Sequence, residues 1–141
     1  MTGGARRGLK AEVSVELEVP FHDVDMLRVV WHGHYYKYFE VARTALLRKY
    51  ELDGQRLLDT GFMFLVIESH CRHVSPLKFG DKFRVGAAFK DLEFRLNMAF
   101  EIHNLTQDRR TAYGYTTLAT VDREGQLMLR TPDVIRARIG V

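Results

Sequence analysis

The sequence predicts an α+β fold in which one long helix lies against an antiparallel sheet. Residues 34–50 have helical periodicity, one alternating segment precedes them, and four strand-like segments follow. Strands that follow one another through hairpin-length loops pair antiparallel, and a lone helix then covers one face of their sheet. The helix has a broad aromatic face, which predicts that a strongly curved sheet wraps around it.

The first two elements are predicted from hydrophobic periodicity. Apolar and polar residues alternate over residues 11–19, which is typical of a half-buried strand. Over residues 34–50 the aromatic and small apolar residues recur every three or four positions, which predicts a helix. Asp53 is a suitable cap for a short second helix over residues 54–59.

The second half of the chain is predicted to consist of strands. Residues 63–74 are rich in β-branched and aromatic types, and residues 83–89 and 94–102 alternate between apolar and polar. A strand of small residues is expected over 111–122, and Pro132 opens a last helical turn over 132–138. This order completes a sheet of five or six strands.

Length and charge indicate one domain that does not bind nucleic acid. The chain has 141 residues and a net charge of +3, and Arg6, Arg7 and Lys10 carry that excess without any acidic neighbour. We expect residues 1–9 to form a flexible tail and residues 10–141 to form a single domain. Because the expected domain is neutral, it lacks the charged face that tracks phosphates.

The composition also limits location and cofactors. The single cysteine, Cys71, excludes an internal disulfide and a multi-cysteine zinc site, and it is expected to be a packed thiol. The longest apolar run, residues 62–67, is far shorter than the ~20 residues that span a bilayer. No apolar segment follows the basic residues near the N-terminus, so we expect no secretory signal, no membrane partner and a cytoplasmic location. No nucleotide-binding motif occurs, and no cofactor is expected.

One polar segment stands immediately before the long helix. It contains His22, Asp23, Asp25, His32 and His34. Unsatisfied N–H groups and a positive dipole end mark the start of a helix, so an oxygen that gains negative charge is stabilised there. A carboxylate in this loop can act as nucleophile or general base on a carbonyl held at the helix tip. Alternatively, the aspartates only bond N–H groups of the turn.

Other chemistry in the sequence is weaker. His32 and His34 with Asp25 offer metal ligands, but residues two apart at a helix start diverge by ~200°, so no metal site is expected. His70 and His73 are predicted on opposite faces of their strand, as ordinary strand residues.

The segment VPFHDVDMLRVVWHGHYYKYFEVARTALL resembles the signature of hotdog-fold acyl-CoA thioesterases of the 4-hydroxybenzoyl-CoA thioesterase type. That signature has an Asp-x-Asp pair, two apolar residues, an aromatic residue, and a helix with Phe-Glu and Ala-Arg. The matching residues are Asp23, Asp25, Val29, Val30, Trp31, His32, Tyr35, Phe39, Glu40, Ala42 and Arg43. The resemblance covers residues 11–130 and implies a hotdog fold, in which a curved antiparallel sheet of five or six strands wraps around one central helix.

The resemblance also implies a function. A thioesterase of this type hydrolyses an acyl-CoA or acyl-carrier-protein thioester to a free carboxylic acid and a thiol. Asp25 would be the catalytic carboxylate, the backbone N–H of His32 would polarise the thioester carbonyl, and His34 would donate a hydrogen bond beside it. Similar proteins are homodimers or homotetramers with active sites between subunits. The expected substrate contacts are Arg28, Trp31 and Tyr35.

Two residues depart from the family pattern, and two other functions stay open. Arg28 stands where the family usually has glycine and His34 where it has asparagine, and we expect both to tune substrate choice. The first alternative is a hotdog dehydratase acting on a 3-hydroxyacyl carrier protein, with His32 or His34 paired with Glu68. The second is a non-catalytic acyl-thioester-binding protein that lost turnover through Arg28.

Overall fold

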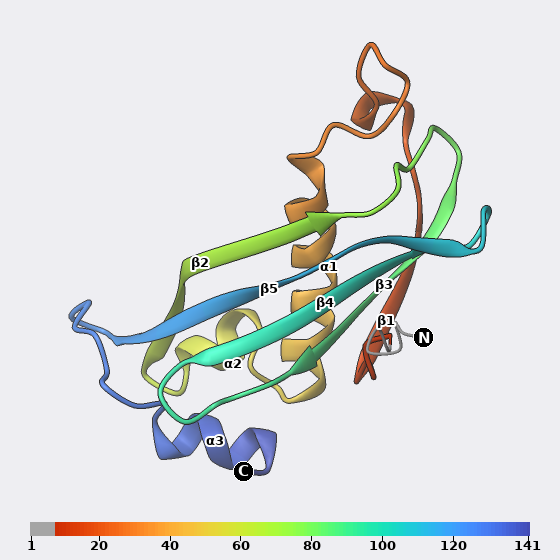
Figure 1. Ribbon diagram of the computed structural model, residues 1–141. Helices are drawn as coiled ribbons and strands as arrows, with labels where there is room; N and C mark the ends of the chain where they lie inside the picture. The colour runs from red at the N-terminus through yellow and green to blue at the C-terminus, as the bar shows by residue number, and fades with distance from the viewer. Residues whose placement is uncertain (1–7) are drawn as a thin grey trace.

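The computed structural model describes residues 8–141, which form one curved antiparallel sheet with a long helix on its inner face (Figure 1). The strand order is β1-β3-β4-β5-β2, so β1 and β2 are the two edges. The strands are β1 (Val13–Glu18), β2 (Phe62–His73), β3 (Lys82–Phe89), β4 (Leu96–Asn104) and β5 (Arg109–Asp122). The predicted fold class, with one strand before the helix and four after it, is confirmed.

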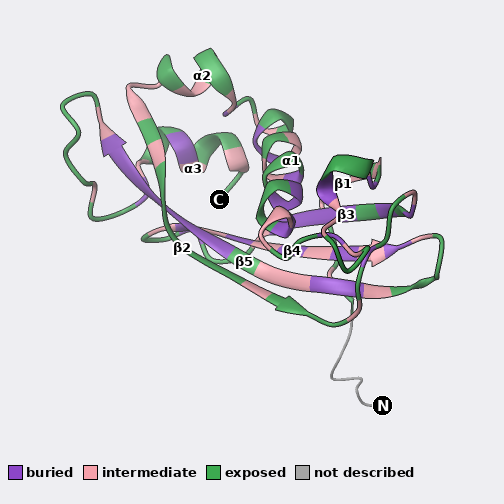
Figure 2. Cartoon of the chain, turned by 90° about the horizontal axis from the view of Figure 1, so that it is seen from above, coloured by how far each residue is buried: buried purple, intermediate pink, exposed green. Residues whose placement is uncertain are grey.

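The central helix α1 (His34–Lys49) buries the face that its periodicity predicts. It packs mainly on β1 and β3, and Figure 2 shows that buried residues line the side turned toward the sheet. Phe39 stacks on Phe100 of β4 with ring centroids 4.8 Å apart, and Tyr38 meets Phe83 of β3 at the same separation. The helix residues with buried side chains are Tyr35, Tyr38, Phe39, Ala42, Leu46 and Leu47. These aromatic contacts fix the helix, and therefore its N-terminus, relative to the sheet.

Two short helices close the other end of the molecule. The first, α2 (Gly54–Leu58), follows α1 and leads into β2, and α3 (Asp133–Ile139) ends the chain with Ile135 in the core. Both confirm the predicted short helices. No helix in residues 8–141 is long and apolar enough to cross a membrane.

β2 is a long edge strand with many exposed side chains. It pairs with β5 along one side, and a β-bulge interrupts the register between Val66 and Glu68. Leu65, Val66 and Ile67 are each about half exposed. Unpaired edges of this length are normally covered by another part of the chain or by another subunit.

The prediction for β4 is wrong at its start. The strand begins at Leu96 and not at residue 94, because its pairing with β5 begins at Leu96, opposite Leu118, and its pairing with β3 begins only at Met98, opposite Phe89. Phe94 is therefore 53% exposed in the loop. Most of the predicted tail lies outside the described residues. Within the described part, the Leu9 N–H donates to the Glu101 carboxylate at 3.1 Å.

Candidate active site

The polar segment before α1 folds as a narrow hairpin over residues 24–30, which projects from the end of the molecule (Figure 1). Val24 and Val30 form a β-bridge, and the Asp25 N–H donates to the Val29 carbonyl at 2.9 Å. Arg28 has a φ of 66°, in the left-handed region. This conformation costs a residue with a Cβ about 1–2 kcal/mol, which explains why glycine suits this position.

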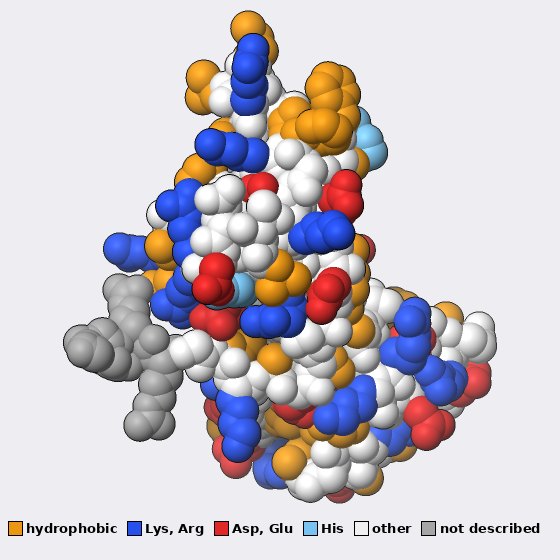
Figure 3. All heavy atoms as spheres, turned by 90° about the vertical axis from the view of Figure 1, so that its right-hand side faces the viewer, with side chains coloured by type: hydrophobic (Ala, Val, Ile, Leu, Met, Phe, Trp, Pro, Cys, Tyr) orange, Lys and Arg blue, Asp and Glu red, His pale blue; other side chains and the backbone are white. Residues whose placement is uncertain are grey.

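Asp25 lies at the turn of the 24–30 hairpin. One of its carboxylate oxygens accepts the Leu27 N–H at 2.8 Å, and no described residue donates to the other oxygen. Arg28 follows on the exposed turn and forms no ion pair with any residue in 8–141. Met26 and Leu27 are 99% and 81% exposed, and Figure 3 shows hydrophobic and basic side chains at this end of the molecule. The hairpin thus presents a carboxylate beside an apolar tip.

Asp23, in contrast, is fully buried and ties the hairpin to α1. Its carboxylate accepts the Tyr38 hydroxyl at 2.5 Å and the Lys37 ammonium at 2.7 Å, and the His34 ring nitrogen lies 3.9 Å away. Burial by itself would raise the pKa of Asp23, but the hydrogen bonds from Lys37 and Tyr38 and the nearby positive charges outweigh it and hold that pKa below its usual value. The first aspartate of the pair is therefore an anchor for the hairpin.

The start of α1 is packed under aromatic rings. A Cβ on Gly33 would lie 2.3 Å from a ring carbon of Trp31, so the indole lies directly over the Gly33 backbone. The half-exposed Trp31 ring also contacts the rings of His32 and His34, with centroids 5.2 and 5.4 Å apart. His34 therefore faces Trp31 and Asp23.

The backbone at His32 fits the expected donor. The His32 carbonyl accepts the Tyr35 N–H at 3.3 Å, as in the first turn of a helix, whereas its own N–H has no acceptor among the described residues. A free N–H immediately ahead of a 16-residue helix is the arrangement that stabilises an oxyanion.

His32 also lines a cavity of about 270 Å³. Tyr35 is buried at its wall and accepts the Leu77 N–H at 3.3 Å through its hydroxyl oxygen. His73 also lines the cavity, with its ring 4.9 Å from the Tyr35 ring and 6.2 Å from the His32 ring. The complete lining is Val30, His32, Tyr35, His73, Val74, Ser75 and Pro76.

His73 lines this cavity, although the sequence analysis treats it as an ordinary strand residue. Burial, followed by the neighbouring His32, lowers the pKa of His73 below its ordinary value, so the neutral ring is favoured. Its place in the alternating pattern of its strand does not distinguish it from the other residues of β2. A neutral imidazole in this cavity can accept or relay a proton.

The hairpin also sets the spacing between Asp25 and His32. The Trp31 N–H donates to the Asp23 carbonyl at 3.1 Å, so Asp23 lies opposite Trp31 in the hairpin. Asp25 is two residues nearer to the hairpin tip than Asp23, and His32 is one residue farther from the tip than Trp31. At the rise per residue of a β-strand, this offset of three residues places the backbones of Asp25 and His32 roughly 10 Å apart along the hairpin.

Other candidate residues lie elsewhere. The Tyr115 hydroxyl donates to Glu68 at 2.7 Å, and the next residue, Ser69, lines a cavity with Phe39 of α1. Because neighbouring strand residues face opposite ways, Glu68 is on the outer face, and one subunit does not pair it with His32 or His34. No group of three potential ligand side chains within residues 8–141 is placed to hold a metal.

Cys71 is half-buried in β2. Burial raises the pKa of its thiol to about 11, so the thiol stays protonated at neutral pH. This agrees with the expected packed thiol and leaves Cys71 without the thiolate that a nucleophile requires.

Comparison with known proteins establishes the class. Residues 19–139 match the thioesterase-like superfamily, and the chain belongs to this family. A relative from Aquifex aeolicus, provisionally named an esterase, is 30% identical over 74 residues, which are 52% of this chain and 58% of the relative. The chain thus matches little more than half the length of that relative.

Solved structures share the fold over nearly the whole chain. A hypothetical protein from Thermus thermophilus has a TM-score of 0.79 at 25% identity, covering 90% of this chain and 96% of its own. A 1,4-dihydroxy-2-naphthoyl-CoA thioesterase from Synechocystis has a TM-score of 0.75 at 18% identity, covering 89% and 93%. The expected hotdog fold and the expected membership of a thioesterase family are confirmed.

Proposed function

We propose that this protein hydrolyses acyl-CoA or acyl-carrier-protein thioesters, with Asp25 as the catalytic carboxylate. The observation that carries the proposal is the free N–H of His32 at the start of α1, on a residue that lines a cavity of about 270 Å³. A thioester carbonyl oxygen in that cavity accepts this N–H, and the helix dipole stabilises the negative charge that develops on it. Relatives named as thioesterases for aromatic acyl-CoA substrates support this substrate class.

The carboxylate can act in two ways. As a general base, Asp25 removes a proton from water, the hydroxide oxygen bonds to the carbonyl carbon, and the C–S bond breaks as the thiolate takes the proton from Asp25. As a nucleophile, an Asp25 oxygen bonds to the carbonyl carbon and expels the thiolate, and water then hydrolyses the resulting anhydride. Its second oxygen, which no described residue bonds, suits either role.

We place the active site between two subunits, so that the substrate lies against residues of both. Asp25 and His32 are roughly 10 Å apart along the hairpin, a gap that the Asp25 side chain and a bound thioester group together can span. The apolar hairpin tip and the long β2 edge support a homodimer or homotetramer, since both leave apolar groups or backbone donors uncovered in a single chain.

Thiol release from a panel of aliphatic and aromatic acyl-CoA and acyl-carrier-protein thioesters tests the proposal. Wild type should release thiol from at least one of them, and Asp25→Asn should lower kcat by at least ~100-fold. Asp59→Asn, at an exposed aspartate that ends α2, is the matched control and should keep the wild-type rate. Label in Asp25 after a single turnover in ¹⁸O-water would identify the nucleophile, because only attack of water on the Asp25 carbon of the anhydride leaves ¹⁸O in the side chain.

Two outcomes would contradict the proposal. An inactive wild type on the entire panel would argue against hydrolysis and favour a binding protein. An Asp25→Asn variant as fast as wild type would remove Asp25 from the mechanism and leave the family assignment intact.

A further inference from the structure

His73 brings a second imidazole, besides that of His32, into the cavity of about 270 Å³ at the start of α1. We name this space the His73 cavity. His73 is the last residue of β2, and side chains beyond the β-bulge of this strand alternate between the two faces of the sheet. His73 therefore shares a face with Ser69 and Cys71. Ser69 lines a cavity against α1 and Cys71 packs on the core, so His73 also points toward the helix.

Two neighbouring rings hold the His73 imidazole in place. The Tyr35 ring lies 4.9 Å from it with a tilt of 36°, and the His32 ring lies 6.2 Å from it at 81°. Tyr35 is itself fixed, because it is buried and its hydroxyl oxygen accepts the Leu77 N–H. Within residues 8–141, no group hydrogen-bonds either nitrogen of the His73 ring, and the carboxylates that pair with histidines pair with other rings. The ring thus has a fixed position and two uncommitted nitrogens.

The surroundings of His73 favour its neutral form. Burial, followed by His32, lowers the pKa of the ring below its ordinary value. The titratable groups that face it are His32 from the loop before α1, Tyr35 from α1, and the protonated thiol of Cys71 on its own strand, while Ala112 is opposite on β5. A neutral imidazole carries one N–H donor and one acceptor nitrogen. The cavity therefore contains a side-chain N–H that is available to an oxygen of a ligand.

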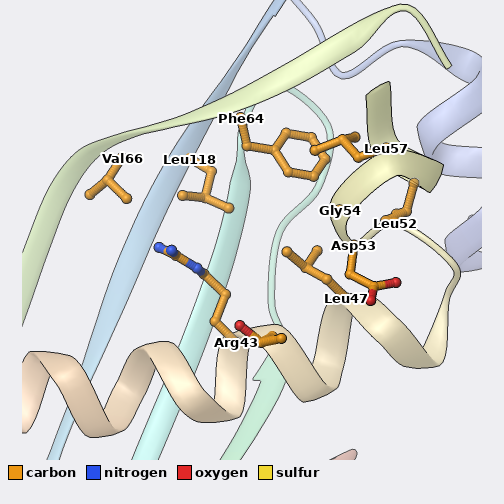
Figure 4. A pocket seen from close by; sticks show the side chains of 10 residues that line it. Arg43, Leu47, Leu52, Asp53, Gly54, Leu57, Phe64, Val66 and Leu118 are labelled. Atoms are coloured by element: carbon orange, nitrogen blue, oxygen red, sulfur yellow. The ribbon is translucent and has the colours of Figure 1, made fainter. Parts of the chain in front are cut away.

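The cavity at the other end of α1 offers no such group. It has a volume of about 220 Å³, and Figure 4 shows that leucine, valine and phenylalanine side chains make up most of its wall. It shares no lining residue with the His73 cavity, and its carboxylate, Asp53, already bonds Arg48 and Arg56. Of the two cavities, only the His73 cavity combines an imidazole without a hydrogen-bond partner with His32, whose backbone N–H is free.

The spacing of His32 and His73 suits two donors to one oxygen. With hydrogen bonds of about 2.9 Å each, two donor nitrogens that share an acceptor lie within roughly 6 Å of one another. The ring centres of His32 and His73 are 6.2 Å apart, which is a separation of this size. A thioester oxygen held between these residues can therefore meet the backbone of one and the ring of the other.

We propose that the His73 ring N–H donates a hydrogen bond to the thioester carbonyl oxygen, as a second donor beside the His32 N–H. When the attacking oxygen bonds to the carbonyl carbon, the π electrons of the carbonyl move onto its oxygen, and both N–H groups stabilise that anion. When the C–S bond breaks, the pair re-forms the carbonyl and the thiolate leaves with the C–S electrons. His73 keeps its proton throughout, so proton transfer stays with Asp25. This inference rests on the proposed thioesterase function and adds a catalytic residue to it.

The test compares three substitutions of His73 on the thioester that wild type hydrolyses fastest. Phenylalanine keeps a ring without a donor, whereas the amide nitrogens of asparagine and glutamine stand close to the places of Nδ1 and Nε2. His73→Phe should lower kcat by roughly 100-fold with KM nearly unchanged, because the bond strengthens in the transition state. Either His73→Asn or His73→Gln should recover at least ~10-fold of that loss. The matched control is His103→Phe, at a ring on β4 that contacts the exposed Asp108, and it should match wild type.

The pH dependence of kcat/KM separates a donor from a base. A donor predicts that the amide variant that recovers activity keeps the acid limb of the wild-type profile. If His73 were a base, wild type would have an acid limb that both amide variants lack, and the proposal would be overturned. This comparison also decides the matter if His73→Phe does not fold, since both amide variants are polar replacements.

Three kinetic results would also count against His73. An unchanged kcat in His73→Phe, a loss confined to KM, or the absence of recovery in both amide variants would each remove the ring from the reaction and leave the hydrolase intact. A wild type that hydrolyses no thioester would be a different failure, because it would refute the proposed function and the role of His73 with it.

Discussion

The buried carboxylate of Asp23 carries a prediction that can be worked from its contacts. Asp23 is 1% exposed and accepts from the Tyr38 hydroxyl at 2.5 Å and from Lys37 at 2.7 Å. A hydrogen bond to a charged group contributes about 1.5–3 kcal/mol, and the Lys37 pair contributes less because that side chain is half exposed. We expect Asp23→Asn to lower the free energy of unfolding by about 2–3 kcal/mol and Tyr38→Phe by about 2 kcal/mol.

The two losses should not add. Each variant removes the same charge-assisted bond, so the double variant should lose about 1–2 kcal/mol less than the sum of the single variants. Urea unfolding at pH 7 and one fixed protein concentration measures all four proteins, since an oligomer's stability depends on concentration. Additive losses would show that the short contact contributes nothing, and would refute the anchor role of Asp23.

The same contact predicts a pH dependence. The pKa of Asp23 is lower in the folded protein than its ordinary value of 3.8, so its contribution is complete above that value and is lost as pH falls through the folded pKa. The stability gap between wild type and Asp23→Asn should therefore narrow in acid. A gap as wide at pH 2.5 as at pH 7 would contradict this reasoning.

Three further predictions follow from single positions. Gly114→Ala should lower the free energy of unfolding by about 3 kcal/mol in urea, because its Cβ would lie 1.9 Å from the His70 carbonyl oxygen and push β5 from β2. Arg28→Gly should raise the free energy of unfolding by about 0.5–1 kcal/mol, because glycine adopts the left-handed backbone conformation of this position without strain. Arg28→Ala should not raise it, because alanine keeps a Cβ. NMR titration should give the His73 ring a pKa below the ordinary 6.5. Because the unfolded chain then takes up this proton at a higher pH than the folded protein does, wild type should lose stability relative to His73→Phe as the pH falls below 6.5.

Each of these has a result that would count against it. If Gly114→Ala were as stable as wild type, β5 and β2 could move apart at the Gly114–Cys71 pair without cost. Equal gains in Arg28→Gly and Arg28→Ala would place the effect in the charge and not in the backbone. A His73 titration at or above 6.5 would mean that its ring is hydrated and remote from His32.

The helices and strands could be predicted from the sequence, but the contacts between them could not. The buried face of α1 follows from its own spacing, so local information predicted it. No feature of the local sequence distinguishes the anchoring Asp23 from Asp25, because the burial of Asp23 depends on Lys37 and Tyr38, one helical turn inside α1. The start of β4 depends likewise on where its pairing with β5 and β3 begins.

The position of His73 shows the same limit over a longer distance. It reaches the cavity only because β2 runs back along the sheet to the start of α1, about forty residues after His32. Strand periodicity places His73 on one face of β2 but does not say which residues face it across the cavity. That information lies in the return path of the chain and not in the strand itself.

The position of Asp25 on the projecting 24–30 hairpin has a genetic consequence. If each site takes its carboxylate from one subunit and its backbone donor from another, Asp25→Asn and His32→Pro damage different halves of a site. A cell that produces both variants assembles mixed dimers in which one site carries both defects and the other carries none. Two alleles that are each inactive alone should then complement one another, and one inactive allele should not silence its neighbour completely.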